Sequence, residues 1–166
     1  TSQTEELLFM NAFYDLPVNQ EGTRLFFSGS VSDSEPGSSL KQFDVNGDST
    51  SITLRLTHPF LRSRGKNLTG YLGFTGRNST TKILGSLDSE DRLRVMTMGF
   101  SYDFADTNKG VNLIRLNLSQ GLNVFDATES GSSNLSRTQG RSNFTKLTGS
   151  FMRIQSMAPS WNLLGA

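Results

Sequence analysis

The sequence predicts an all-β fold, an antiparallel meander of about seven long strands. Three observations predict it: apolar residues recur at every second position, the alternating runs are about ten residues long, and polar or glycine-rich breaks separate them. A helix would scatter side chains that lie two positions apart around its circumference, whereas a strand places them on one face. The period of two therefore indicates strands throughout.

The clearest alternating run lies between residues 92 and 105, where Met96, Met98, Phe100, Tyr102 and Phe104 alternate with small or polar residues. The runs 52–56 and 114–118 alternate in the same way, and Leu68, Leu72 and Phe74 share a face with Gly70. We therefore expect seven strands, at residues 6–17, 23–34, 50–60, 67–78, 92–105, 111–124 and 144–156.

Three of these runs are less regular. The first two have clear apolar faces, but Phe9, Phe13 and Phe26 lie opposite to them. In the last run, the facing near Phe151 and Met152 is ambiguous. Alternation still predicts strands here, with some aromatic residues on the otherwise polar face.

The breaks between the runs are turns and loops. The short breaks 19–22 and 107–110 contain Asn and Gly, which favour turns. Longer polar stretches span 33–49, 79–91 and 126–143. Short and long connections alternate roughly, as in barrels with short turns on one side and long loops on the other. The only segment that suggests a turn of helix is 85–94.

Strand length helps to choose between a membrane barrel and a soluble β protein. Soluble strands usually contain about five or six residues, whereas a strand that crosses a bilayer needs roughly nine to eleven. The long runs therefore favour a membrane barrel. The alternative is a soluble extracellular β-sandwich or small barrel that binds a ligand or a protein partner, because alternation and Ser- and Asn-rich loops serve that fold equally.

Composition excludes several classes of function. Lys and Arg number 16 and Asp and Glu number 15, so the net charge of +1 provides no basic surface for nucleic acid. The same balance provides no polybasic membrane anchor. The chain has no Cys, which excludes disulfides, thiolate metal sites and a Cys nucleophile.

No motif supplies a catalytic, cofactor-binding or metal-binding residue, and we expect no enzyme activity. His58 is the only histidine, so a multi-histidine site cannot form within the chain. Residues 44–48 resemble the start of a calcium loop, but Ser49 and Arg55 stand where an EF-hand needs Gly and Glu, so an Asn-Gly turn is expected. Asn-x-Ser/Thr triplets begin at Asn67, Asn78, Asn117, Asn134 and Asn143.

Several short motifs, taken in order, resemble the barrel of two-partner secretion transporters, the haemolysin activation and secretion proteins. In the family, a strand ends in a hydrophobic-Pro step that is followed by Arg-Ser-Arg and an Asn-Leu strand start. Each motif alone is weak, but their order spans nearly the whole chain. The motifs lie at residues 14–17, 22–25, 54–64, 67–68, 121–123, 135–137 and 144–147.

The resemblance implies a sixteen-stranded pore in the outer membrane of a Gram-negative bacterium, preceded by two periplasmic domains. Such a pore passes a secreted exoprotein, such as a haemolysin or an adhesin, outward without ATP. It implies outer-membrane lipid and the exoprotein as partners, and no nucleic acid. No functional residue of the family maps onto a position of this sequence.

The chain departs from the family plan, and we expect residues 1–166 to be a single segment of the barrel. It shows no periplasmic domains or linker, no Val-Arg-Gly-Tyr-like motif and no terminal aromatic residue. Seven strands cannot close into a pore, and an open edge in lipid leaves backbone groups unpaired. In water, such a piece is expected to curl into a sheet or sandwich, or to self-associate through its edges.

Overall fold

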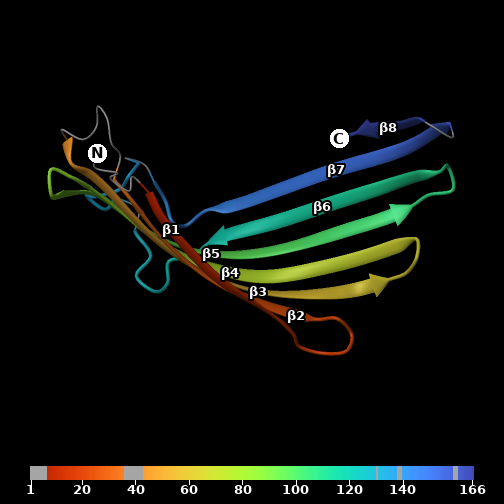
Figure 1. The fold of residues 1–166 in the computed structure, drawn as a ribbon, viewed down its shortest axis with the longest axis horizontal. Helices are drawn as coiled ribbons and strands as arrows, with labels where there is room; N and C mark the ends of the chain where they lie inside the picture. The colour runs from red at the N-terminus through yellow and green to blue at the C-terminus, as the bar shows by residue number, and fades with distance from the viewer. Residues whose placement is uncertain (1–6, 36–42, 130, 138–139, 159–160) are drawn as a thin grey trace, which may run out of the picture.

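The chain folds as one antiparallel sheet. A computed structural model describes residues 7–35, 43–129, 131–137, 140–158 and 161–166. Each strand pairs with its neighbours in sequence, so the sheet is an eight-stranded meander. It is curved and strongly twisted (Figure 1). The strands are β1 (Leu7–Pro17), β2 (Arg24–Ser34), β3 (Val45–Arg62), β4 (Lys66–Ile83), β5 (Ser86–Ala105), β6 (Gly110–Gly121), β7 (Thr145–Ala158) and β8 (Trp161–Gly165).

The predicted meander is confirmed, but two predictions were wrong: the long loop at 79–91 and the helical turn at 85–94. The polar stretch 79–91, predicted as a long loop, continues β4 and β5 as a hairpin whose turn is Leu84 and Gly85. These two residues have φ of 52° and 72°, as a two-residue turn with both central residues left-handed requires. The expected helical turn within 85–94 is therefore strand, and no helix among the described residues is long and apolar enough to cross a membrane.

The number of strands also differs, because β8 was not predicted. Its five residues contain two adjacent leucines and no alternation, so the period-two signal is absent. The strand predicted at 111–124 ends at Gly121, and the loop predicted at 33–49 is shorter because β3 begins at Val45. Residues 36–42 of that loop lie outside the described part of the chain.

The connections gather at the two ends of the sheet. The turn end, at the right in Figure 1, holds the short connections 18–23, 63–65 and 106–109. The loop end holds the turn 84–85, and β2, β3, β6 and β7 each have one end there, where the longer connections between them begin and end. The predicted short turns are confirmed, and the long loop before β7 is confirmed in a slightly longer form.

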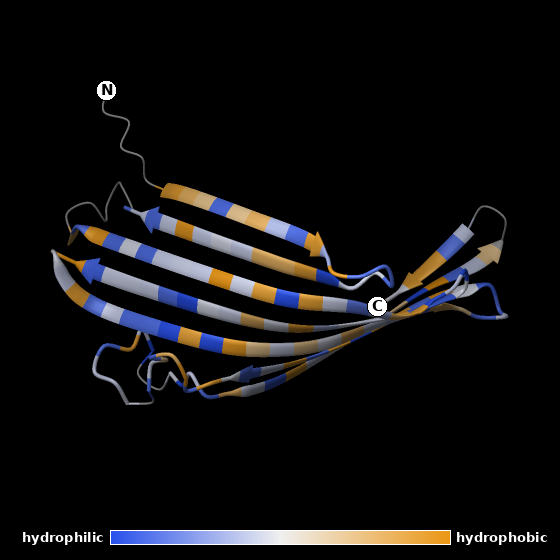
Figure 2. Cartoon of the chain, turned by 90° about the horizontal axis from the view of Figure 1, so that it is seen from below, coloured by the Kyte–Doolittle hydropathy of each residue, from blue (hydrophilic) through white to orange (hydrophobic). Residues whose placement is uncertain are grey.

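The sheet has no second layer and no hydrophobic core. Within the described residues no hydrophobic side chain is buried, and each of the eight strands has exposed large apolar residues. A sandwich would bury one face of this sheet against another sheet about 10 Å away, but all the strands belong to one sheet. Figure 2 shows hydrophobic and hydrophilic positions alternating along the strands.

The turn between β5 and β6 is tied to β7 through Asp106. Its carboxylate accepts hydrogen bonds from the backbone N–H groups of Asn108 and Gly110, each at 2.9 Å. Arg153 on β7 donates to the same carboxylate at 2.6 Å, and Asn112 donates at 3.2 Å. The backbone bond from Gly110, then Asn112 and Arg153, lower the pKa of Asp106 to about 2. The cluster links β6 to β7 at the turn end, where no short turn joins these strands.

We expect Asp106→Asn to weaken the folded protein at neutral pH. A lowered pKa means that the carboxylate stabilises the fold above its ordinary pKa of about 4, and this stabilisation is lost as the pH falls through about 2. The urea midpoint, followed by the circular dichroism of the sheet, should be lower in the variant at pH 7, and the difference should shrink toward pH 2. Asp126→Asn in the loop is the control, and equal midpoints for wild type and Asp106→Asn at pH 7 would contradict the role of the cluster.

Candidate functional site

One face of the sheet is apolar, and its side chains line up across the strands. One cross-strand row has Leu or Met on each of seven strands. The neighbouring row toward the loop end contains Tyr14, Phe27, Leu54, Phe74 and Met96. The Leu and Met row consists of Leu16, Leu25, Leu56, Leu72, Met98, Leu118 and Leu147.

This face forms a belt that shifts along successive strands. On β1 its apolar residues run from Leu8 to Leu16, on the loop side of the Leu and Met row. On β6 they run from Ile114 to Leu118, and on β7 from Leu147 to Phe151, both on the turn side. Strands of membrane barrels tilt by roughly 35–45°, so a belt of constant height must shift in this way. We call the apolar residues of this face on β1 to β7 the apolar belt.

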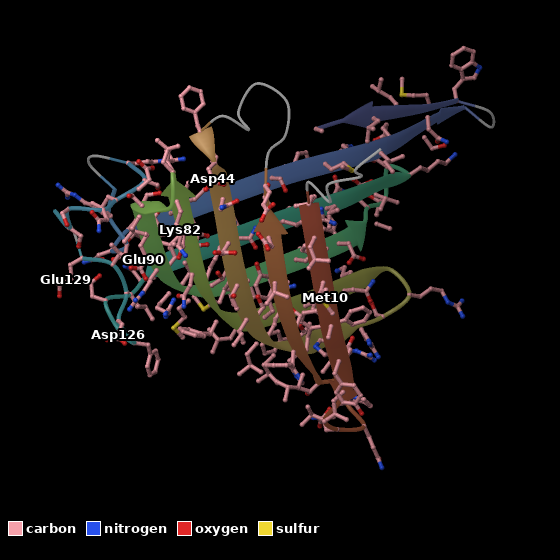
Figure 3. All side chains as sticks on the ribbon, turned by 60° about the vertical axis from the view of Figure 1, so that its left-hand side comes forward. Met10, Asp44, Lys82, Glu90, Asp126 and Glu129 are labelled. Carbon is pink, nitrogen blue, oxygen red and sulfur yellow. The ribbon has the colours of Figure 1, made fainter. Side chains whose placement is uncertain are left out.

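Beyond the belt, the loop end is hydrophilic. Figure 3 shows Asp44, Lys82 and Glu90 at this end of the sheet, away from Met10 on β1. On β4 the apolar face changes after Phe74 to Gly76, Asn78 and Thr80. The last third of the β4–β5 hairpin therefore extends past the belt as a polar ribbon.

The opposite face is polar, and its side chains hydrogen-bond across strands. The hydroxyls of Thr53 and Thr75 lie 3.2 Å apart, and Tyr71 donates to Asn117 at 2.8 Å. Asn67 donates to the carboxylate of Asp103 at 2.7 Å. These bonds leave a hydrophilic wall of small side chains, as the alternation predicted.

Tyr71 lies across the neighbouring strand and fixes the centre of the polar face. A Cβ atom on Gly99 would lie 2.4 Å from the Tyr71 ring and 2.5 Å from the Asn117 oxygen, so only Gly fits beneath the ring. The guanidinium carbon of Arg55 lies 5.0 Å from the ring centroid, within the range of a cation–π contact. The ring is therefore held from three strands.

The polar face carries an excess of positive charge. Within the described residues its one ion pair joins Arg24 and Asp15 at 3.0 Å. The other anionic side chains on this face are Asp91 and Asp103. Against them stand five further cations, at positions whose register places them on this face: Arg55, Arg62, Arg77, Arg115 and Lys146.

Three aromatic residues interrupt the polar face near β1, as the sequence analysis predicted. Phe13 and Phe26 stack with their ring centroids 6.2 Å apart and their planes at 25°. Phe9 lies on the same side of β1, four residues further toward the loop end. The register also settles the facing of β7: Phe151 lies on the apolar face and Met152 on the polar face.

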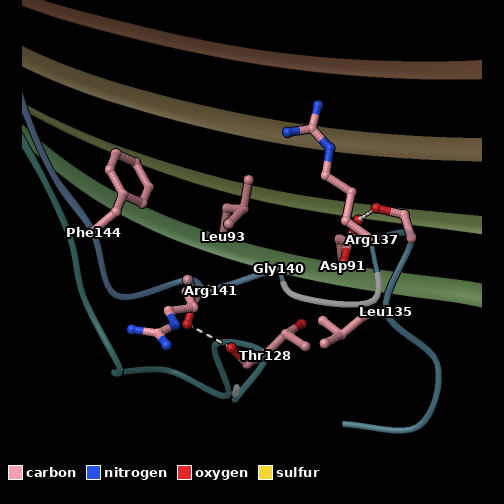
Figure 4. Close-up of a pocket in the computed structure, with 10 residues that line it drawn as sticks. Asp91, Leu93, Thr128, Leu135, Arg137, Gly140, Arg141 and Phe144 are labelled. Atoms are coloured by element: carbon pink, nitrogen blue, oxygen red, sulfur yellow. Dashed lines mark hydrogen bonds between the residues drawn. The ribbon is translucent and has the colours of Figure 1, made fainter. Parts of the chain in front are cut away.

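The long loop 122–144 folds back onto the polar face at the loop end. Ser136 donates a hydrogen bond to the carboxylate of Asp91, and Ser142 donates to the backbone oxygen of Thr128 at 2.5 Å. The loop and β5 enclose an open cavity of about 460 Å³, with Leu93 and Phe144 on one side and Arg141 near Thr128 (Figure 4). The loop therefore narrows this end of the polar face.

Gly121 lets the loop take this path. A Cβ atom at Gly121 would lie 1.8 Å from the backbone oxygen of Ser142, so a larger residue would displace the returning loop. The backbone N–H of Gly121 also donates to the oxygen of Phe144 at 2.7 Å. This feature was not predicted from the sequence, where its one signal is a glycine at the end of a strand.

The sequence motifs that were considered as possible catalytic or metal-binding sites have structural roles. The ring Nδ1 of His58 lies 2.7 Å from the hydroxyl oxygen of Thr23, and the ring packs edge-on against Phe60. The Asn-Gly turn expected at 44–48 is wrong, because Asn46 and Gly47 lie within β3 and pair with β4. Pairing of both residues with β4, and of Gly47 also with β2, outweighs the turn preference of this dipeptide. The described residues contain no group of three metal-ligating side chains.

The chain is similar to a family of haemolysin secretion/activation proteins and to one solved structure. The family model of the haemolysin secretion/activation protein ShlB/FhaC/HecB matches residues 6–163. The solved structure of CdiB from Escherichia coli has a similar fold, with a TM-score of 0.76 at 17% sequence identity. That likeness covers 95% of this chain and 30% of the CdiB chain. No curated protein sequence matches the chain.

The match to the family model extends over nearly the whole sheet, from the first strand to the last. It agrees with the order of the motifs from Tyr14 to Leu147 and with the antiparallel meander of the structure. The chain belongs to the haemolysin secretion/activation protein family ShlB/FhaC/HecB.

Proposed function

We propose that residues 1–166 are one segment of the wall of an outer-membrane pore, which secretes a haemolysin- or adhesin-like exoprotein without ATP. The observation that carries the proposal is the pairing of a shifted apolar belt with a polar face on one sheet. The chain spans about 30% of the CdiB chain, and the secretion activity would belong to the complete transporter.

The height of the belt suits a bilayer. On β5 it runs from Met96 to Phe104, which is about 26 Å along the strand at about 3.3 Å per residue. A tilt of about 40° reduces this length to about 20 Å of height, close to the roughly 25 Å apolar band of outer-membrane barrels. The short turns would then face the periplasm and the loop end the exterior.

The polar face suits the passage of an unfolded chain. Hydroxyl and amide side chains offer hydrogen bonds that a sliding polypeptide can exchange, and the cations Arg55, Arg77 and Arg115 would attract acidic segments. Transport without ATP is what the family resemblance implies. Membership of the family supports a transporter rather than an enzyme.

Open edges support a larger barrel. In the described residues, β1 and β8 each pair on one side only. In a bilayer their unpaired backbone groups would cost several kcal/mol each, so further strands must continue the sheet. Eight more strands would complete the sixteen-stranded pore, with the exoprotein inside and lipid outside.

We expect a charge on the apolar face to destabilise the complete barrel far more than the same charge on the polar face. Met98→Lys places an ammonium group at the centre of the belt, which should cost about 2–4 kcal/mol in a bilayer. The adjacent Thr97→Lys places it on the polar face and should have little effect. Urea titration of the complete transporter in phospholipid vesicles measures both. Equal losses of stability would show that this face does not meet lipid.

The exoprotein should contact the polar face during secretion. A photoreactive amino acid at Ser101 or Thr53 should cross-link to the exoprotein in cells that secrete it, because both side chains face the pore. The same group at Phe100 or Leu54, one position away, should cross-link only to lipid. Cells without the exoprotein are the control. Exoprotein adducts from the apolar positions alone would refute the proposed orientation of the sheet.

A further inference from the structure

We propose that a groove at the loop-side margin of the apolar belt binds a phosphate-bearing membrane lipid, with the phosphate at Arg94 and an acyl chain over Gly76. This inference rests on the proposed function, which places the apolar face in a bilayer. The groove is open and has a volume of about 300 Å³. It is lined by Thr50, Ile52, Phe74, Gly76, Asn78, Arg94 and Phe125.

The groove has a largely apolar floor and one aromatic wall. Ile52, Gly76 and Arg94 follow one another in a cross-strand row on β3, β4 and β5. Phe125 reaches from the long loop to Phe74, with the ring centroids 6.2 Å apart and the rings nearly perpendicular. These two rings form a wall beside the floor, so the groove offers a strip for a hydrocarbon chain.

Gly76 keeps the floor open. A Cβ atom there would meet no atom closer than 3.6 Å, which is ordinary van der Waals contact. The backbone therefore does not require glycine at this position, in contrast to Gly99 beneath Tyr71. The missing side chain leaves space that a ligand can fill.

Arg94 provides a fixed positive charge at one end of the groove. Its Nη1 donates to the side-chain oxygen of Asn78 at 2.9 Å and to the backbone oxygen of Arg77 at 3.2 Å. In the described part of the chain no carboxylate lies within ion-pair distance of Arg94. Glu90, four residues earlier on β5, is paired with Arg92 at 2.7 Å. The guanidinium is thus positioned by the protein and lacks a counter-ion from it.

The position of Arg94 matches the level of lipid headgroups. It lies two residues past Met96, the last belt residue of β5, which is about 7 Å along the strand. A cation above an apolar strip is complementary to an amphiphile that has an anionic head. Guanidinium binds phosphate through paired hydrogen bonds, and the loop end faces the outer leaflet. A phosphate-bearing lipid of that leaflet therefore fits both ends of the groove.

The test measures lipid retained by the purified complete transporter. After incubation with lipid A and detergent washing, native mass spectrometry should show one retained lipid on the wild type. Arg94→Gln removes the charge, and Gly76→Leu fills the floor, so each should reduce retention roughly tenfold, as the loss of about 1.4 kcal/mol would. Dephosphorylated lipid A should be retained as poorly by the wild type as lipid A is by Arg94→Gln.

Two variants serve as matched controls. Arg64→Gln removes the same charge from the exposed connection 63–65 at the turn end, far from the groove. Gly29→Leu adds the same side chain in the same cross-strand row as Gly76, where no arginine is adjacent. Both should retain lipid A as the wild type does. Each variant's barrel is checked by its heat-dependent electrophoretic mobility and by secretion of the exoprotein.

Several outcomes would overturn the inference. Equal retention by wild type, Arg94→Gln and Gly76→Leu would remove the groove as a lipid site, while normal barrels and secretion left the proposed function standing. Displacement of lipid A by inorganic phosphate alone would show an anion site without a lipid tail. A wild-type protein that formed no barrel would instead sink the proposed function.

Discussion

The hydrogen-bonded ladder between neighbouring strands is the constraint on which the other features depend. It runs through all eight strands and shows only three register shifts, near Pro59, Thr81 and Ser156. Because side chains alternate, a slip of one residue would move every side chain of a strand to the other face. The ladder therefore determines both faces together: the row from Leu16 to Leu147 on one, and the row through Tyr71, Gly99 and Asn117 on the other.

Alternation predicted the belt better than it predicted the strands. The strands predicted at 67–78 and 92–105 stop at residues 78 and 92, four residues past Phe74 and Met96, where the apolar face ends. In the structure β4 and β5 continue to Ile83 and Ser86. Beyond the belt neither face needs apolar residues. The alternation of apolar and polar residues therefore ends there, although the backbone hydrogen bonding between the strands continues. The stretch 79–91 was predicted as a loop because its residues are polar and show no alternation. The turn itself has no sequence signal either, because Leu84 is not a residue type that favours tight turns.

Other features depend on contacts between residues distant in sequence. The groove at Gly76 requires Phe125 from a loop and Arg94 from the next strand, and the cluster at Asp106 requires Arg153. Neither pairing has a local signature in the sequence. The fold class, the family resemblance and the two faces could be predicted from alternation and motif order, whereas the loop path and β8 depend on tertiary contacts or lack a period.

The path of the long loop follows from the unequal lengths of the strands. β6 ends at Gly121, opposite Val95, which leaves the edge of β5 from Ser86 to Arg94 without a neighbouring strand. The loop covers part of this edge: Leu122 and Thr128 donate backbone hydrogen bonds to Arg94 and Arg92, and the N–H of Glu90 donates to Asn134.

An exposed edge of this length invites pairing with other chains, so a hairpin that extends past the belt needs such a cover. After covering the edge, the chain must return to begin β7 beside β6, and Gly121 gives it room to cross onto the polar face at Ser142. The same loop places Phe125 on the apolar face against Phe74. The narrowing of the polar face and the wall of the groove are thus two consequences of one unpaired strand edge.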